Sequence, residues 1–115
     1  MIVDDDNAMT SLLKTLLEME PEGFEVSVAP RGGTALEKAE VDPPEIFIVD
    51  YHLNDMDGIE LVGYLRGSDM FADTPIIMAS GLDVEKEALA AGVDLFLIKP
   101  FEPGDLAGIL LDMLG

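Results

Sequence analysis

The sequence contains no cysteine and no tryptophan, and it has a single histidine and few positive charges. Without cysteine the protein has no disulfide scaffold, no cysteine-ligated zinc and no thiol redox chemistry. Six lysines and arginines stand against 24 aspartates and glutamates, giving a formal net charge of −18 that repels nucleic-acid phosphates and anionic lipid. We therefore expect no direct binding to nucleic acid or to a membrane surface.

Two further absences concern the cellular location. No apolar run approaches the roughly 18 residues that a membrane-spanning helix needs, and no signal-peptide pattern precedes the first apolar segment. These absences predict a soluble, cytoplasmic protein. The 115 residues, of which 49% are hydrophobic, suffice for one folded domain with a single core. We expect that domain to cover residues 1–115.

The stretch 46–58 organises the rest of the chain. Residues 46–49 are four bulky apolar residues without polar alternation, which predicts a strand buried on both faces at the centre of a parallel sheet. The run ends at Asp50. Open α/β sheets place their ligand crevice beyond the carboxyl ends of the strands, so chemistry is expected at Asp50.

Strands and helices alternate along the whole chain. Apolar runs predict strands at 1–3, 24–28, 46–50, 75–80 and 93–98. Asp6 and Asp83 are predicted N-caps of the first and fourth helices, and Gly92 is predicted to end the fourth. Because residues 24–28 alternate apolar with polar, we place that strand at an edge. The sequence thus predicts an α/β fold, a doubly wound (βα)5 parallel five-stranded sheet with strand order 2-1-3-4-5.

Such a sheet gathers several polar side chains at one end. Asp4, Asp5 and Asp50 would meet there, with Ser80 and Lys99 beside them. Converging carboxylates repel one another unless they are protonated or neutralised by a cation, and oxygen-only ligands favour Mg²⁺, with Mn²⁺ as the alternative. A metal, a hydroxyl and an ammonium form a pocket for a transferring phosphoryl group, so Asp50 is the candidate nucleophile.

Five separated motifs carry a family resemblance. They are Val3-Asp4-Asp5, Asp50, Met56-Asp57-Gly58, Ser80 and Lys99-Pro100-Phe101. In this order they resemble the response-regulator receiver domain of two-component signalling, the CheY-like family. The resemblance implies a flavodoxin-like fold and a phosphorylation-activated switch. Its acceptor, Asp50, would take a phosphoryl group from a phosphohistidine on a histidine kinase or a histidine phosphotransfer protein.

The resemblance also assigns roles to individual residues. Asp4, Asp5 and Asp50 would bind Mg²⁺ together with the backbone carbonyl of His52. Ser80 and Lys99 would hold the phosphoryl oxygens. Phe96 stands at the position of the family's switch aromatic, which turns inward as the Ser80 hydroxyl moves. Pro100 follows Lys99 in a peptide bond that the family usually makes cis.

The implied output is a conformational shift on the face formed by the fourth helix, the fifth strand and the fifth helix. A downstream protein target or a fused output domain would read it, and activation could produce a homodimer. We expect a phosphoacceptor that assists its own phosphotransfer and its slow autodephosphorylation, not an enzyme. No effector domain is expected within these residues, so the chain is either a stand-alone receiver or a fragment of a larger regulator or hybrid kinase. The abrupt start at Met1 favours the fragment.

Some positions depart from the family pattern. Asn54 stands where the family usually has proline, and Ser80 replaces the commoner threonine. Leu82, two residues beyond Ser80, offers no hydrogen bond to an attacking water. By helical spacing Met9 and Leu12 are core residues, whereas the resemblance suggests that this edge of the first helix docks the kinase.

Three other classes of protein share some of these features. A receiver that is never phosphorylated would act as a binding module, but such chains usually lose the acidic pair, the lysine or the acceptor. A flavodoxin-type cofactor binder needs a phosphate loop after its first strand, where Asp4, Asp5 and Asp6 would repel the phosphate. An aspartyl phosphatase usually has a second acid two residues after its nucleophile, and His52 occupies that position.

Overall fold

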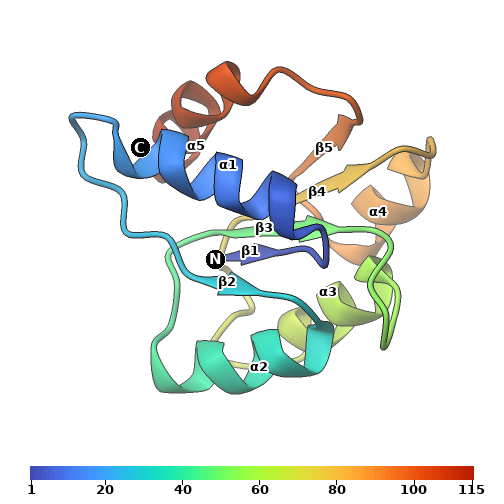
Figure 1. Ribbon diagram of the computed structural model, residues 1–115. Coiled ribbons are helices and arrows are strands. Elements are labelled where there is room, and N and C mark those ends of the chain that lie inside the picture. The colour runs from blue at the N-terminus through green and yellow to red at the C-terminus, as the bar shows by residue number, and fades with distance from the viewer.

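Five parallel strands form one sheet with helices on both faces in the computed structural model, which describes residues 1–115 (Figure 1). In chain order the elements are β1 (Ile2–Val3), α1 (Asn7–Glu18), β2 (Val28–Ala29), α2 (Gly32–Val41), β3 (Phe47–Asp50), α3 (Gly58–Arg66), β4 (Ile76–Ser80), α4 (Glu85–Ala91), β5 (Leu95–Ile98), a 3₁₀ turn at Pro103–Asp105, and α5 (Leu106–Leu114). The strand order β2-β1-β3-β4-β5 confirms the predicted doubly wound, flavodoxin-like topology.

The sheet separates two apolar layers. Helices α1 and α5 cover one face and α2, α3 and α4 cover the other (Figure 1). Strand β4, which lies next to the central strand β3, contributes to both layers, since Ile76 and Met78 belong to one cluster and Ile77 to the other. All three side chains are fully buried, and burying each stabilises the fold by about 1.5–3 kcal/mol. The middle of the sheet is therefore a rigid support for its carboxyl ends.

Helix α1 begins where the sequence predicted. The Asp6 carboxylate accepts a hydrogen bond from the Met9 backbone N–H at 3.1 Å, the contact of an N-cap. The buried stripe of the helix contains Leu13 and Leu17, whereas Leu12 is 45% exposed. The prediction from helical spacing that Leu12 lies in the core is therefore wrong.

Helix α4 begins later than predicted. Val84, whose side chain packs against the core, occupies the N-cap position, and its N–H donates to the Leu82 carbonyl in a tight turn. This turn leaves Asp83 outside the cap, with only a long 3.4 Å contact from the Glu85 N–H. The predicted capping role of Asp83 is therefore wrong. Gly92 ends the helix with φ +111°, as predicted.

The edge strand β2 covers only Val28–Ala29, so it shares a single residue with the predicted 24–28 and ends one residue beyond it. It pairs only with β1, in the register Ile2↔Val28, and the last ladder bond runs from the Ile2 N–H to the Ser27 carbonyl at 2.8 Å. No residue of β1 lies opposite residues 24–26, so nothing holds them in the sheet. A groove of about 660 Å³ occupies that position. The edge placement of the strand is confirmed.

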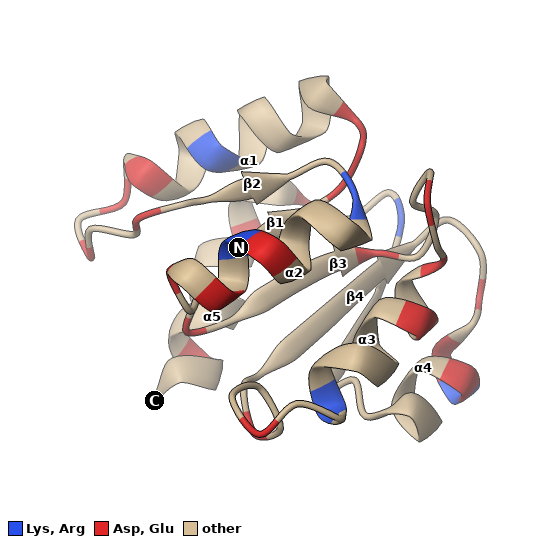
Figure 2. Ribbon diagram, turned by 90° about the horizontal axis from the view of Figure 1, so that it is seen from below, with Lys and Arg blue, Asp and Glu red and all other residues tan.

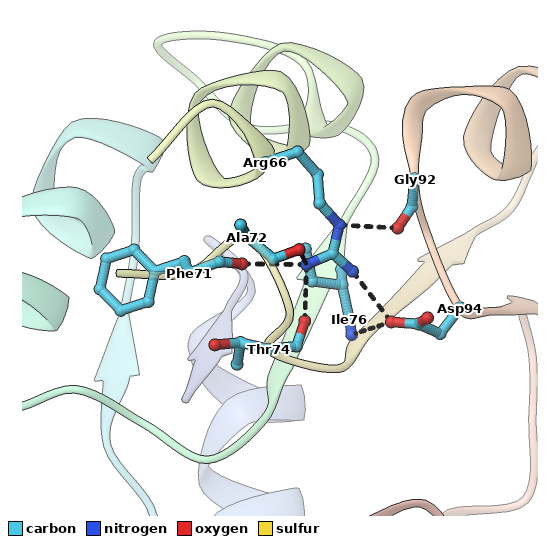
Figure 3. A network of polar contacts seen from close by, with 7 residues as sticks. All are labelled: Arg66, Phe71, Ala72, Thr74, Ile76, Gly92 and Asp94. Carbon is cyan, nitrogen blue, oxygen red and sulfur yellow. Dashed lines mark hydrogen bonds and ion pairs between the residues drawn. The ribbon is translucent and has the colours of Figure 1, made fainter. Parts of the chain in front are cut away.

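Arg66, at the end of α3, ties two loops to the sheet (Figure 3). Its guanidinium lies 2.9 Å from the Asp94 carboxylate, and the same carboxylate oxygen accepts the Ile76 N–H. The guanidinium also donates to four backbone carbonyls, those of Gly92, Phe71, Ala72 and Thr74. One side chain thus fixes the α3–β4 and α4–β5 connections.

Acidic residues lie on helices and loops around the molecule, and the few basic residues are scattered between them (Figure 2). None of the helices combines the length and the apolar character that crossing a membrane requires.

Candidate functional site

Three carboxylates meet at the carboxyl end of the sheet. Asp4 and Asp5 follow β1, and Asp50 is the last residue of β3, which pairs directly with β1. Each residue offers one carboxylate oxygen, and these oxygens all lie within 4.8 Å of one another. The Asp4 and Asp50 side chains are only 7% and 11% exposed. The structure thus brings together the three carboxylates that the sequence placed at this end.

Lys99 supplies the positive charge of the cluster. Its Nζ lies 3.0 Å from Asp50 Oδ1 and 3.4 Å from Asp4 Oδ2. The lysine directly follows β5, where its backbone N–H donates to the Ser80 carbonyl at 2.7 Å. The peptide bond to Pro100 is cis, as the resemblance implied. One ammonium group therefore faces three carboxylates.

The charges of this cluster shift two pKa values. Burial raises the pKa of Asp50, Asp4 and Asp5 raise it further by repulsion, and Lys99 opposes both effects. Burial acts against the charge of Lys99, but its contacts with Asp50 and Asp4 outweigh burial and raise the pKa of the lysine. With three carboxylates and one ammonium group, the negative charge of the cluster is not fully compensated.

The donor set suits a hard divalent cation. All three groups are carboxylates, and no imidazole or thiolate accompanies them, which matches the oxygen ligands of Mg²⁺ and Mn²⁺. A divalent ion would add the positive charge that Lys99 alone does not supply. The residues present therefore fit such an ion.

Ser80 and Phe96 lie on the two strands beyond Asp50. Ser80 ends β4 and is fully buried, and its Oγ accepts a hydrogen bond from the Leu82 N–H at 2.9 Å. Phe96 pairs with Met78 across β4 and β5, and its half-buried ring packs against the core on the side of α3 and α4. Leu82 is 54% exposed.

The motif Met56-Asp57-Gly58 has a packing explanation. Asp57 caps α3, because its Oδ1 accepts the Glu60 N–H at 2.8 Å. A Cβ on Gly58 would lie 2.6 Å from the Asp50 backbone oxygen, so only glycine fits beside Asp50. The side chain of His52 is exposed, and an isolated bridge pairs its backbone with that of Asp57.

Sequence reasoning missed one residue of this region. Both Asp55 carboxylate oxygens accept backbone N–H groups at the start of α2, those of Gly32 and Gly33, each at 2.9 Å. The contact joins segments more than 20 residues apart, so no local sequence pattern predicts it. The one available signal is that Arg31, which precedes α2, is not a capping residue.

Comparisons with known proteins agree with this geometry. The model of the response regulator receiver domain family matches residues 1–111. The transcriptional regulatory protein CpxR of Escherichia coli is 38% identical over 109 residues, which are 92% of this chain and 44% of CpxR. The phosphate regulon transcriptional regulatory protein PhoB of Rhizobium meliloti is 34% identical over 116 residues, which are 98% of this chain and 50% of PhoB. The chain thus spans about half the length of these curated relatives.

Solved structures are similar over nearly their whole length. A CheY-like response regulator receiver domain protein from Methanospirillum hungatei superimposes with a TM-score of 0.88 at 34% identity, covering 98% of this chain and 90% of that one. Chemotaxis protein CheY4 of Vibrio cholerae gives 0.87 at 30% identity, covering 96% and 93%. With a family match over residues 1–111 and these structural neighbours, the chain belongs to the response regulator receiver domain family.

Proposed function

We propose that this receiver is the phosphorylation-activated switch of a two-component phosphorelay. Asp50 accepts a phosphoryl group from a phosphohistidine on a histidine kinase or a histidine phosphotransfer protein. The observation that carries the proposal is the position of the Asp50 carboxylate, 11% exposed, at the end of β3, with Asp4 and Asp5 close by and Lys99 Nζ at 3.0 Å. This combination provides a nucleophile, a cation site and a phosphate contact in one crevice.

The ion site is proposed at Asp4, Asp5 and Asp50, together with the backbone carbonyl of His52. When bound there, Mg²⁺ neutralises charge on the phosphoryl oxygens and favours the ionised form of Asp50. Mn²⁺ is the alternative ion. Asp6 takes no part in this site, since its carboxylate is occupied as the N-cap of α1.

In the transfer step an Asp50 carboxylate oxygen attacks the phosphorus of the phosphohistidine. The O–P bond forms as the P–N bond breaks, and the imidazole nitrogen keeps the electron pair of that bond. Lys99 already binds Asp50 Oδ1, so a short movement of its ammonium group brings it to a phosphoryl oxygen. The product is an aspartyl phosphate that carries close to two negative charges where the carboxylate carried one.

Ser80 and Phe96 are proposed to couple the phosphorylation of Asp50 to a change of conformation. A hydroxyl group can donate and accept at once, so Ser80 Oγ can donate to a phosphoryl oxygen while it still accepts the Leu82 N–H. That bond would draw the start of the β4–α4 connection toward the site, and Phe96 would turn into the space vacated. The protein assists its own phosphotransfer and its slow autodephosphorylation without being a turnover enzyme.

The output face is proposed to be α4, β5 and α5. Leu89 and Ile98 on this face are each 49% exposed, which suits a surface that another protein covers. The partner that recognises this face would be a downstream protein target, a fused output domain or a second copy of the receiver. If one of the two conformations binds the phosphoryl group more strongly by about 1.4 kcal/mol, the ratio of their populations shifts tenfold. A shift from 1:99 to 99:1 requires a difference of about 5.5 kcal/mol.

The test is intact-protein mass spectrometry after incubation with Mg²⁺ and acetyl phosphate. We expect a gain of one phosphoryl group that is lost in EDTA and in Asp50→Asn. Asp69→Asn, an exposed change of the same charge, should still gain it. A parent protein that gains no mass with acetyl phosphate or with other small phosphodonors would contradict the proposal and favour a binding module that works without phosphate.

A further inference from the structure

The loop that follows Asp50, residues 51–57, is called the acceptor loop here. Its ends are closed on each other, since the Gly58 N–H donates to the Tyr51 carbonyl at 2.6 Å and the backbones of His52 and Asp57 form a bridge. These contacts fix the base of the loop. They do not fix its outer part against the rest of the molecule.

Asp55 makes that outer connection. Its two carboxylate oxygens accept the Gly32 and Gly33 N–H groups at 2.9 Å, so the loop is anchored to the first turn of α2 by a two-point contact. These hydrogen bonds also lower the pKa of the Asp55 carboxyl. Charge-assisted bonds of this kind are about twice as strong as neutral ones and fix orientation as well as distance.

The partner surface on α2 is shaped for the loop. Arg31 occupies the N-cap position of α2 and makes no side-chain capping bond, so the helix relies on Asp55 to satisfy its first N–H groups. A Cβ on Gly32 would lie only 2.6 Å from the sulfur of Met56, which shows how closely the Met56 side chain packs over this glycine. Loop and helix therefore interlock at two successive residues.

Asn54 precedes this anchor and stands where the family usually has proline, as noted for the sequence. Proline stiffens a loop by fixing φ, and asparagine does not. The backbone N–H of Asn54 takes part in no backbone hydrogen bond, so a proline there would remove none. Asn54 therefore does not give the loop the rigidity that proline would, and the Asp55 contact provides rigidity in another way.

We propose that Asp55 is a positioning residue for the phosphoacceptor site: it anchors the acceptor loop to α2, and so holds the His52 carbonyl toward the ion, in place of the rigidity that proline would give. The inference rests on the proposed function for the position of the ion. Through the acceptor loop, the start of α2 would thus influence the acceptor site. Asp55 itself touches neither the ion nor the phosphoryl group.

The test compares Mg²⁺ affinity, by isothermal titration calorimetry, with thermal stability in a set of variants. Asp55→Ala should weaken Mg²⁺ binding about tenfold, the usual effect of removing a group that orients a metal ligand. Asp55→Asn keeps one acceptor oxygen and should give a smaller loss. The matched control is Lys38→Met, which removes another α2 contact, the 2.7 Å bond from Lys38 to the Val28 carbonyl, without touching the loop.

The decisive variant is Asn54→Pro in the Asp55→Ala background. If Asp55 acts through loop rigidity, proline should restore most of the Mg²⁺ affinity and the hydrogen-exchange protection of residues 51–57. Mg²⁺ affinity within twofold of the parent in Asp55→Ala would overturn the inference, and so would a loss that Lys38→Met reproduces or that Asn54→Pro leaves unrepaired. A parent that binds Mg²⁺ but takes no phosphoryl group would contradict the proposed function only.

Discussion

Asp50 is largely buried beside two other carboxylates, and Lys99 offsets only part of their charge. Burial and the repulsion from Asp4 and Asp5 raise its pKa above the ordinary 3.8, so the folded protein holds that proton more tightly than the unfolded chain does. The stability linked to this proton is complete below pH 3.8 and is lost as the pH rises through the raised pKa. At neutral pH the ionised Asp50 carboxylate therefore destabilises the fold.

Asp50→Asn should remove the destabilisation that the buried Asp50 charge causes at neutral pH. In EDTA at pH 7 we expect a higher urea midpoint for the variant than for the parent, because the amide keeps the shape of the carboxylate without its charge. Mg²⁺ at 100 times its dissociation constant should add about 2.7 kcal/mol to the parent and much less to the variant. Asp112→Asn, an exposed change of the same charge, should alter neither quantity. A lower midpoint for Asp50→Asn in EDTA would show that the pairing with Lys99 outweighs burial.

Two glycines of α3 make a matched pair for the packing around the acceptor. In Gly58→Ala the new Cβ would meet the Asp50 backbone oxygen at 2.6 Å, and a backbone atom cannot move aside cheaply. We expect a loss of about 1–3 kcal/mol in urea denaturation, the usual result of overpacking. A Cβ on Gly63 meets nothing within 4 Å, so Gly63→Ala should stabilise the helix by about 0.5–1 kcal/mol. Equal effects of the two changes would show that helix propensity alone matters here.

The sequence located much of the candidate site because each of its carboxylates and its lysine ends an apolar run. Parallel strands bring such residues together whatever the details of the helices. Asp55 could not be found in this way, since its partners, the Gly32 and Gly33 N–H groups, lie 23 and 22 residues away. A contact between two loops depends on how they fold over the sheet edge, and no periodic pattern records it.

At the scale of the elements, Arg66 is the side chain that joins the most segments (Figure 3). It lies on α3 and its guanidinium contacts the α3–β4 connection, the residue that ends α4, and Asp94 before β5. Removing it would leave several carbonyl groups without their donor, and each unpaired buried group costs about 1–3 kcal/mol. The elements α4 and β5, which belong to the proposed output face, are therefore held at their base by a residue of α3.

Arg66→Met should lower the free energy of unfolding by about 2–4 kcal/mol and speed hydrogen exchange at the Ile76 amide, whose acceptor Asp94 would lose its partner. The free energy of unfolding of Arg66→Lys should lie between those of the parent and of Arg66→Met, because an ammonium group cannot reach several carbonyls in one plane. The control is Arg31→Met, since Arg31 is exposed and its side chain makes no capping hydrogen bond. If Arg66→Met changed stability no more than Arg31→Met does, the hydrogen bonds of Arg66 would contribute nothing measurable to the stability of the fold.

The identity and order of the strands and helices could be predicted from apolar periodicity. The predictions failed where contacts with other parts of the chain determine where an element begins or ends. The order of strands and helices was predictable because buried strands read as continuous apolar runs. The extent of β2 was not, since a strand persists only where another strand pairs with it. The start of α4 was also missed, because Val84 takes the cap position by packing against the core, a tertiary effect stronger than the capping preference of Asp83.

At the scale of the whole molecule, the charge of −18 acts on the fold as self-repulsion. The molecule measures 34 × 31 × 27 Å, and only three of its six basic residues form ion pairs. At 0.01 M salt the screening length is about 30 Å, so each carboxylate acts on the others across the whole protein. At 0.15 M the length falls to about 8 Å, and only near neighbours interact.

The urea midpoint should therefore rise between 0.01 M and 0.15 M KCl in EDTA, by a stabilisation of the order of 1 kcal/mol, since even neighbouring unit charges in water interact by about 1 kcal/mol. Urea is uncharged and leaves the ionic strength unchanged. Choline chloride should act as KCl does, because screening needs no binding site, and Asp50→Asn should retain the salt effect. A rise with KCl that choline chloride does not reproduce, or that Asp50→Asn abolishes, would instead place the stabilisation in cation binding at the acceptor site. The general charge and the local site can thus be separated in one titration.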